Sequence, residues 1–283
     1  MPKIKPTPSE VFTAENQTAL IKVINSLWGM QIDTITQDRV IRALELQGLP
    51  NEWLNKLTQN VDFFIDHQFT PTIVGKVEVV GSATAYMVGE AIDATISYEF
   101  GSNAISFVNS EMENLLNNIK NPLNDNVIDV LRSSIDNNWG ISQTEEMMRS
   151  ALNLTTRDNR AVINFMAHLP KDTTDKQRIA MGKQYYLKLR RLRSERIAQT
   201  ELTRVKHFGE IDALNQSIAN GNIKEATKLW VKTNMKDNWD SSIINDGVEV
   251  GLNEGFPEPC ATGNDQYPSE IKEYCYLEYP IKI

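Results

Sequence analysis

Hydrophobic residues recur three and four positions apart through most of the chain, which is the spacing of one face of an α-helix. In the first 70 residues this pattern predicts several short helices. One is expected to start at Thr7-Pro8-Ser9-Glu10, where a cap-like Thr precedes a Pro, and a helical face then runs from Leu20 to Trp28. Thr36 is expected to cap the next helix, and Asn51 opens another that continues to Ile65.

Residues 71–108 mix two signals. Four glycines stand among the β-branched residues and alanines; Val77 and Val79 alternate as in a strand, whereas the alanine and methionine content suits close-packed helices. We favour helix for this segment. From about Ser106 to Leu154 the helical spacing is clear again, with breaks expected at Asn121-Pro122 and at Trp139-Gly140.

Two cap signals follow. Thr156 is expected to cap a helix that stops at Pro170, and Thr174 with Gln177 matches a capping box. The capping box opens the longest helical run of the chain. We expect this run to reach Ala219 with an interruption, and Asn220-Gly221 to end it.

After residue 220 the pattern changes from helix to strand. LWVKT (229–233) is predicted to be a strand, NDG (245–247) is a turn signal, and Val248, Val250 and Leu252 then alternate. YCYLEYPI near the end also alternates. The predicted fold is therefore mainly α, with a long basic helix and a small α+β C-terminal unit. We divide it into an N-terminal helical region (1–120), a helical body with the long helix (121–219) and the C-terminal unit (220–283).

Composition adds that the chain is of the soluble, globular type, since 41% of its residues are hydrophobic and 23% are charged. No run approaches the ~20 apolar residues of a membrane span, so we expect no membrane partner. MPKIKPTPSE has no apolar signal core, so we expect no export. Cys260 and Cys275 are read as isolated thiols, with a disulfide as the alternative.

Charge is unevenly distributed along the chain. Residues 171–206 hold eleven Lys or Arg against four Asp or Glu, a net charge of +7 within a chain of net charge −8. Two interpretations compete: a solvated helix, or a surface that contacts phosphates or an acidic partner without reading bases. We expect Tyr185, Leu189 and Leu192 to form a narrow apolar seam, continued by Ala198, Leu202, Val205 and Phe208. The candidate DNA or partner contacts are Lys183, Lys188, Arg190, Arg191, Arg193 and Arg196.

The order of features after this segment resembles the C-terminal part of the phage Mu F-like head morphogenesis proteins, the minor head proteins of tailed bacteriophages. There an R-x-A-x-T-E segment on a helix precedes a Trp-containing strand, an Asp-Gly turn and a cysteine-containing end. The resemblance covers roughly residues 125–283. The matching positions are Arg196, Ala198, Thr200, Glu201, Arg204, Trp230, Asp246, Gly247, Phe256, Pro257 and Cys275. The chain has NWDSSIIN where family members commonly carry an Arg and a His before the turn.

The resemblance implies a structural virion protein, inside the capsid or at the portal vertex and in the host cytoplasm during assembly. Its implied partners are the portal protein, the major capsid protein, or both, and packaged DNA bound without sequence preference. Its implied role is head assembly, DNA packaging or genome ejection. The alternatives are a phage-encoded enzyme, such as a nuclease or transferase, and a helical adaptor protein.

Candidate chemistry is sparse in the sequence, so we expect no enzyme and no cofactor. His67, His168 and His207 lie on separate predicted helices, and two cysteines supply too few ligands for a zinc site. Glu201 is expected to pair with Arg204 at i, i+3 on one helix. Asp246-Gly247 is read as turn chemistry, because glycine accepts a positive φ.

Overall fold

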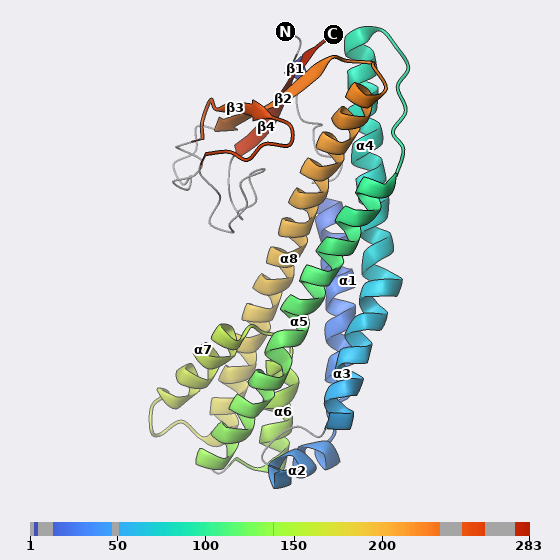
Figure 1. The fold of residues 1–283 in the computed structure, drawn as a ribbon. Helices are drawn as coiled ribbons and strands as arrows, with labels where there is room; N and C mark the ends of the chain where they lie inside the picture. Colours follow the sequence, from blue (N-terminus) through green and yellow to red (C-terminus); the bar gives the residue numbers. More distant parts are fainter. Residues whose placement is uncertain (1–2, 5–13, 47–50, 138, 233–244, 258–274) are drawn as a thin grey trace. The chain divides into compact units, whose positions relative to one another are not determined.

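The structure, a computed structural model, describes residues 3–4, 14–46, 51–137, 139–232, 245–257 and 275–283 (Figure 1). The elements are β1 (Lys3–Ile4), α1 (Ala14–Ile32), α2 (Gln37–Leu46), α3 (Asn51–Phe64), the π-helix η1 (Ile65–Phe69), α4 (Thr70–Ile92), α5 (Ser102–Asp136), α6 (Ile141–Ala151), α7 (Thr156–Ala167), α8 (Asp175–Ala219), β2 (Glu225–Lys232), β3 (Glu249–Gly251) and β4 (Cys275–Lys282). The predicted mainly α fold, with a long helix and short strands near the C-terminus, is confirmed. Thr7-Pro8-Ser9-Glu10 and Cys260 lie outside the described residues.

The chain divides into two compact units that are each discontinuous in sequence. The sheet unit combines residues 1–20, 71–109 and 196–283, and the helical unit combines residues 21–70 and 110–195. Both α5 and α8 contribute residues to both units. The division into three consecutive regions stays a prediction.

The start of α8 follows directly from its sequence. Thr174 Oγ1 accepts a hydrogen bond from the Gln177 amide, and the Gln177 side chain accepts one from the Thr174 amide, so the predicted capping box is confirmed. The interruption predicted within α8 is wrong, because the helix is continuous over 45 residues. It ends before Gly221, whose φ of +71° suits a residue without a Cβ.

Helix α7 is capped one residue earlier than expected. Thr155, not Thr156, has the extended backbone of a cap, and its side chain accepts a hydrogen bond from the Asp158 amide. The sequence TT offers two equivalent cap residues, so local chemistry alone does not choose between them.

The helix preferred for residues 71–108 is confirmed for most of that segment. α4 runs to Ile92, and α5 begins at Ser102 after a short connection. Close packing explains the glycines: a Cβ on Gly81 would lie 2.4 Å from the Tyr98 ring, and one on Gly89 would lie 2.4 Å from the Ala94 carbonyl oxygen.

The break predicted at Asn121-Pro122 is wrong, because α5 continues through Pro122. A proline inside a helix removes one backbone hydrogen bond and costs about 3 kcal/mol. The neighbouring side chains of Ile119, Leu123 and Val127 are all buried. Their burial favours a continuous helix and outweighs the local cost. The break at Trp139-Gly140 is confirmed, since α6 starts at Ile141.

The strands form one antiparallel sheet in the order β1-β4-β2-β3. β2 begins at Glu225, four residues before the predicted strand, and Trp230 lies opposite Leu277 of β4. The alternation predicted for β4 is confirmed at Leu277 and Tyr279, which are both buried. This face of the sheet forms a core with Val88 of α4 and Leu214 of α8.

Candidate functional site

The basic residues of α8 do not share one environment. Lys183 Nζ lies 2.7 Å from Glu146 Oε1, and Arg191 Nε lies 3.6 Å from Glu195 Oε1. Lys188 and Arg196 are exposed, while Arg190 is half-buried and burial lowers the pKa of its guanidinium. Five of the six candidate contacts therefore have at least part of their side chains at the surface.

Arg193 is the exception, and it leaves the set of candidate DNA contacts because only 8% of it is exposed. Its guanidinium donates a hydrogen bond to the Asn118 carbonyl oxygen at 3.0 Å and lies 5.5 Å from the centre of the Trp28 ring. Burial lowers the pKa of Arg193 to about 10, so it stays charged at neutral pH. Arg193 thus stabilises the helical unit from inside.

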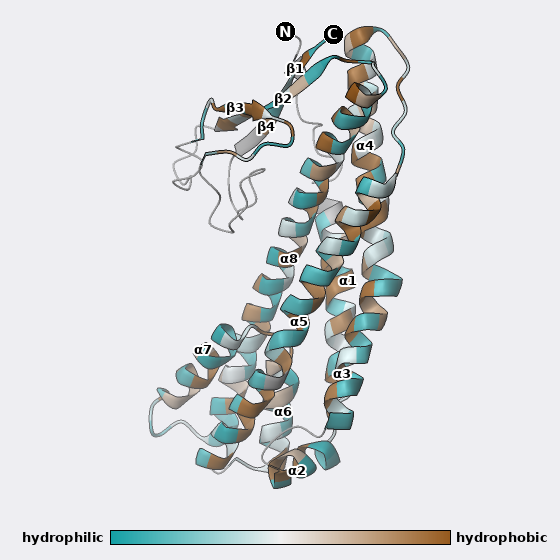
Figure 2. Cartoon of the chain, in the orientation of Figure 1, coloured by the Kyte–Doolittle hydropathy of each residue, from teal (hydrophilic) through white to brown (hydrophobic). Residues whose placement is uncertain are grey.

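The predicted apolar seam of α8 is one residue out of register. Tyr186, not Tyr185, is buried, and its hydroxyl donates to Asn159 Oδ1 at 2.7 Å. Leu192 is 37% exposed. Hydrophilic and hydrophobic residues are interspersed along α8 (Figure 2), so its sequence does not mark one apolar face. The continuation through Ala198, Leu202 and Val205 is confirmed, since all three are buried.

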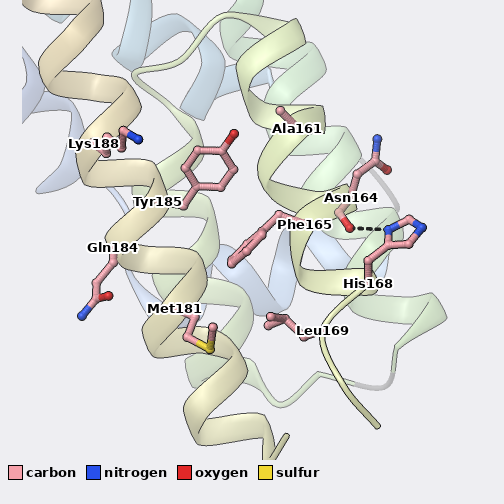
Figure 3. A pocket seen from close by; sticks show the side chains of 9 residues that line it. All are labelled: Ala161, Asn164, Phe165, His168, Leu169, Met181, Gln184, Tyr185 and Lys188. Carbon is pink, nitrogen blue, oxygen red and sulfur yellow. Dashed lines mark hydrogen bonds between the residues drawn. The ribbon is translucent and has the colours of Figure 1, made fainter.

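Met181 and Tyr185 of α8 line a groove with residues of α7 (Figure 3). The groove has a volume of about 770 Å³. The rings of Phe165 and Tyr185 meet edge to face in it, 5.2 Å apart. Its nine lining residues are Ala161, Asn164, Phe165, His168, Leu169, Met181, Gln184, Tyr185 and Lys188.

Several residues of the family motif meet in the sheet unit. The Gly247 amide donates to the Trp230 carbonyl oxygen at 2.9 Å, and the Trp230 amide donates to the Val248 carbonyl oxygen at 3.0 Å. Gly247 has a φ of +77°, so the predicted Asp-Gly turn is confirmed. The ring of Trp230 packs edge to face on Phe256 at 4.9 Å. The turn is thus tied to the Trp-containing strand.

The remaining motif residues lie on α8 and β4. Arg204 Nη1 lies 3.6 Å from Glu201 Oε1, so the predicted i, i+3 pair is confirmed. Thr200, directly before Glu201, is half-buried. Cys275 begins β4, and its side chain lies outside the described residues.

A buried polar cluster was missed by the sequence reasoning. Tyr279 of β4 donates its hydroxyl to Glu210 Oε2 at 2.9 Å, and His207 Nδ1 lies 3.3 Å from the same oxygen. Lys228 of β2 is buried as well. Burial lowers the pKa of His207, against the opposing effect of the neighbouring Glu210 carboxylate. His207 and Glu210 are one helical turn apart, but only the tertiary fold shows that β4 covers them.

The other two histidines lie at helix surfaces. His67 Nδ1 lies 3.0 Å from the Phe63 carbonyl oxygen, and His168 Nδ1 lies 2.7 Å from that of Asn164. Within the described residues, no three His, Cys, Asp or Glu side chains are grouped as a metal site would need. None of the described helices combines the length and apolar character of a membrane span.

Comparison with known proteins gives no relative: no family model, no curated protein and no solved structure matches the chain.

Proposed function

We propose that the chain is a structural minor head protein of a tailed bacteriophage. It associates with the portal or the capsid interior and acts in head assembly, DNA packaging or genome ejection. The observation that carries this proposal is the order of the residues by which the chain resembles the head morphogenesis proteins, with Trp230 ahead of the Asp246-Gly247 turn. Trp230 and Gly247 are 17 positions apart in sequence, and the Gly247 amide donates to the Trp230 carbonyl oxygen. This hydrogen bond supports the proposal because it joins two of the matching positions within the sheet unit.

The exposed cations of α8 support contact with packaged DNA. Lys188, Arg191 and Arg196 are exposed, and residues 171–206 carry a net charge of +7. Arg and Lys side chains bind phosphates through charge, without sequence preference. The net charge of −8 for the whole chain limits such contact to this segment.

Mass spectrometry of purified particles tests the assignment. We expect a few copies of the chain per virion, retained when the portal is isolated. Infected cells that contain the chain but release particles without it would exclude a role as a head component. Activity on DNA or on a transferable group, with no copies in the particle, would support the enzyme alternative.

The salt dependence of DNA binding tests the cation surface. Replacing Lys188, Arg191 and Arg196 by Glu removes three exposed positive charges. If each contacts one phosphate, the slope of log K against log salt concentration falls by about 2.7, at about 0.9 per contact.

A matched control changes three exposed cations elsewhere in the chain, Lys22, Lys56 and Arg132, to Glu. Both triple variants carry the same net charge, so a general charge effect would alter both slopes equally. Equal slopes would remove DNA contact by α8 from the proposal.

A further inference from the structure

The groove between α7 and α8 (Figure 3) is lined by apolar side chains from both helices. On α7, Ala161 and Phe165 lie four residues apart, and on α8, Met181 and Tyr185 do the same. Residues at this spacing lie on one helix face, so the groove has an apolar row on each side. Two helices with facing apolar rows form a groove into which the apolar face of a third helix can pack.

The groove is long enough for a short helix. A second hollow, of about 460 Å³, is lined by Gln177, Ala180 and also Met181, so it adjoins the first. From Gln177 to Lys188 the rise of α8 is about 16 Å, at about 1.5 Å per residue. A partner helix of about three turns spans that length.

The groove side of α8 is partly uncovered within the helical unit. Met181 is 41% exposed and Tyr185 is half-buried, whereas the neighbouring Tyr186 is buried. Exposed apolar side chains that gather in a groove mark an interaction surface more often than scattered ones do. Because Tyr186 already packs inside the helical unit, the Met181 side of α8 is available to a partner.

The charged residues around the groove favour a partner with acidic side chains. Lys188 is charged, whereas Asp and Glu are absent from the nine residues that line the larger hollow. Arg157, one helical turn before Ala161 on α7, is exposed. One acidic side chain, Asp172, lines the smaller hollow. Residues 171–188, which include the α8 residues that line both hollows, hold five Lys or Arg against two Asp, a net charge of +3.

We propose that this groove binds an amphipathic helix of a partner protein, with Asp and Glu flanking its apolar face. The apolar residues of the partner pack onto Phe165, Met181 and Tyr185, and its carboxylates lie near Lys188 and Arg157. This proposal does not depend on the role proposed above, although Lys188 belongs to both surfaces. DNA is disfavoured as the occupant, because a phosphate backbone makes no use of the apolar rows.

Two synthetic peptides test the charge selection on the full chain. Both are 16-residue helices with Leu at positions i, i+3, i+4 and i+7 and a fluorescent label. One carries Glu at the flanking positions and the other carries Lys. We expect fluorescence anisotropy to show saturable binding of the Glu peptide that weakens with salt, and at least about tenfold weaker binding of the Lys peptide, since loss of about 1.4 kcal/mol is tenfold. Equal binding of the two peptides, or no binding of the Glu peptide, overturns the proposal.

A matched pair of variants tests the location. Met181→Glu places a charge in the groove, whereas Leu187→Glu places the same charge on the same helix outside the groove lining, at a side chain that is 45% exposed. We expect M181E to weaken binding of the Glu peptide at least about tenfold more than L187E, because it also removes an apolar contact. Circular dichroism checks that both variants keep their helix content.

The same variants separate a helix from DNA. We expect M181E and L187E to bind a 20-base-pair duplex equally, because they carry equal charge. If M181E alone loses duplex binding, the groove is a DNA site and the proposal is wrong. If the two variants bind the Glu peptide equally, the peptide binds elsewhere and the proposal is also wrong.

Discussion

The hydroxyl of Tyr279 links β4 to α8, and its removal is the most direct test of the buried polar cluster. Tyr279→Phe keeps the ring but deletes the donor that lies 2.9 Å from Glu210 Oε2. Both side chains are buried, with Tyr279 at 0% and Glu210 at 1% exposure. Water therefore cannot replace the lost partner without opening the unit.

The size of the expected loss of stability depends on the polar contacts that Glu210 retains in the variant. Among the described residues its other oxygen, Oε1, accepts no hydrogen bond, and Lys206 Nζ lies 3.9 Å away from it. His207 Nδ1 remains 3.3 Å from Oε2. A buried acceptor that loses its partner costs about 1–3 kcal/mol, whereas the retained ring leaves no cavity. We expect the free energy of unfolding of the sheet unit to fall by that amount.

Hydrogen-exchange mass spectrometry measures this loss within the sheet unit itself. A decrease of about 1–3 kcal/mol makes the slowest amides of β2 and β4 exchange about 5- to 150-fold faster, when exchange reports the opening free energy. Tyr86→Phe is the matched control, because it deletes the same group from a side chain in α4 that is 64% exposed. The control is expected to change stability by no more than about 0.5 kcal/mol.

Exchange of β2 and β4 at equal rates in the two variants would refute the reasoning. It would mean that the Tyr279 hydroxyl contributes no net stability despite its burial. Faster exchange confined to the helical unit would refute it as well, because Tyr279 and Glu210 both belong to the sheet unit.

Three further predictions concern packing, pH and a buried amide. Gly209→Ala is expected to lower the free energy of unfolding by about 1–3 kcal/mol, since its Cβ would lie 2.9 Å from Val80. Gly75→Ala has open space around it and is expected to raise the free energy of unfolding by about 0.5–1 kcal/mol. Opposite shifts in melting temperature check both expectations. Burial lowers the pKa of His207, so just below pH ~6.5 the unfolded chain takes up a proton at this histidine and the folded chain does not. Stability therefore falls as pH decreases through this window. His207→Gln is expected to flatten this dependence of the free energy of unfolding on pH, measured by urea titrations. Asn126→Ala is expected to cost about 2–4 kcal/mol, because Asn126 Nδ2 donates to two buried carbonyl oxygens at 3.0 and 2.7 Å; thermal unfolding checks it.

Each of these has an outcome that contradicts it. Equal melting temperatures for the two glycine variants would show that α4 and α8 can separate at Gly209 without cost. A pH slope that persists in His207→Gln would assign it to another group. A wild-type melting temperature in the Asn126 variant would show that water satisfies both carbonyls.

Local chemistry made much of the secondary structure predictable. The capping box at Thr174 and the turn at Gly247 depend on hydrogen bonds and backbone angles within a few residues, and both are confirmed. The alternation around Tyr279 needed only the two-residue period of a strand. In the candidate site, sequence reasoning located the Glu201–Arg204 pair for the same reason, since one helical turn separates them.

What local chemistry could not give was the choice of buried face. The sequence of α8 favours Tyr185 as the buried side chain, yet the fold buries Tyr186, whose hydroxyl donates to Asn159 of α7. The sequence predicts Arg193 as a surface cation because a charge favours water, yet the Asn118 carbonyl and the Trp28 ring replace that water in the fold. The sequence predicts a break at Pro122 because of its local cost, and burial around it outweighs that cost.

The sequence by itself determined the mainly helical character of the chain, the capping box that starts α8, the net charge of the α8 segment and the turn at Gly247. Only the tertiary structure decided which side chains lose contact with water. That selection places Tyr279 on Glu210 and leaves Met181 and Tyr185 along an open groove. The physical reason is the distance in sequence between the interacting residues. Caps and turns depend on hydrogen bonds between residues a few positions apart, whereas burial depends on residues far away in sequence that pack on the same face.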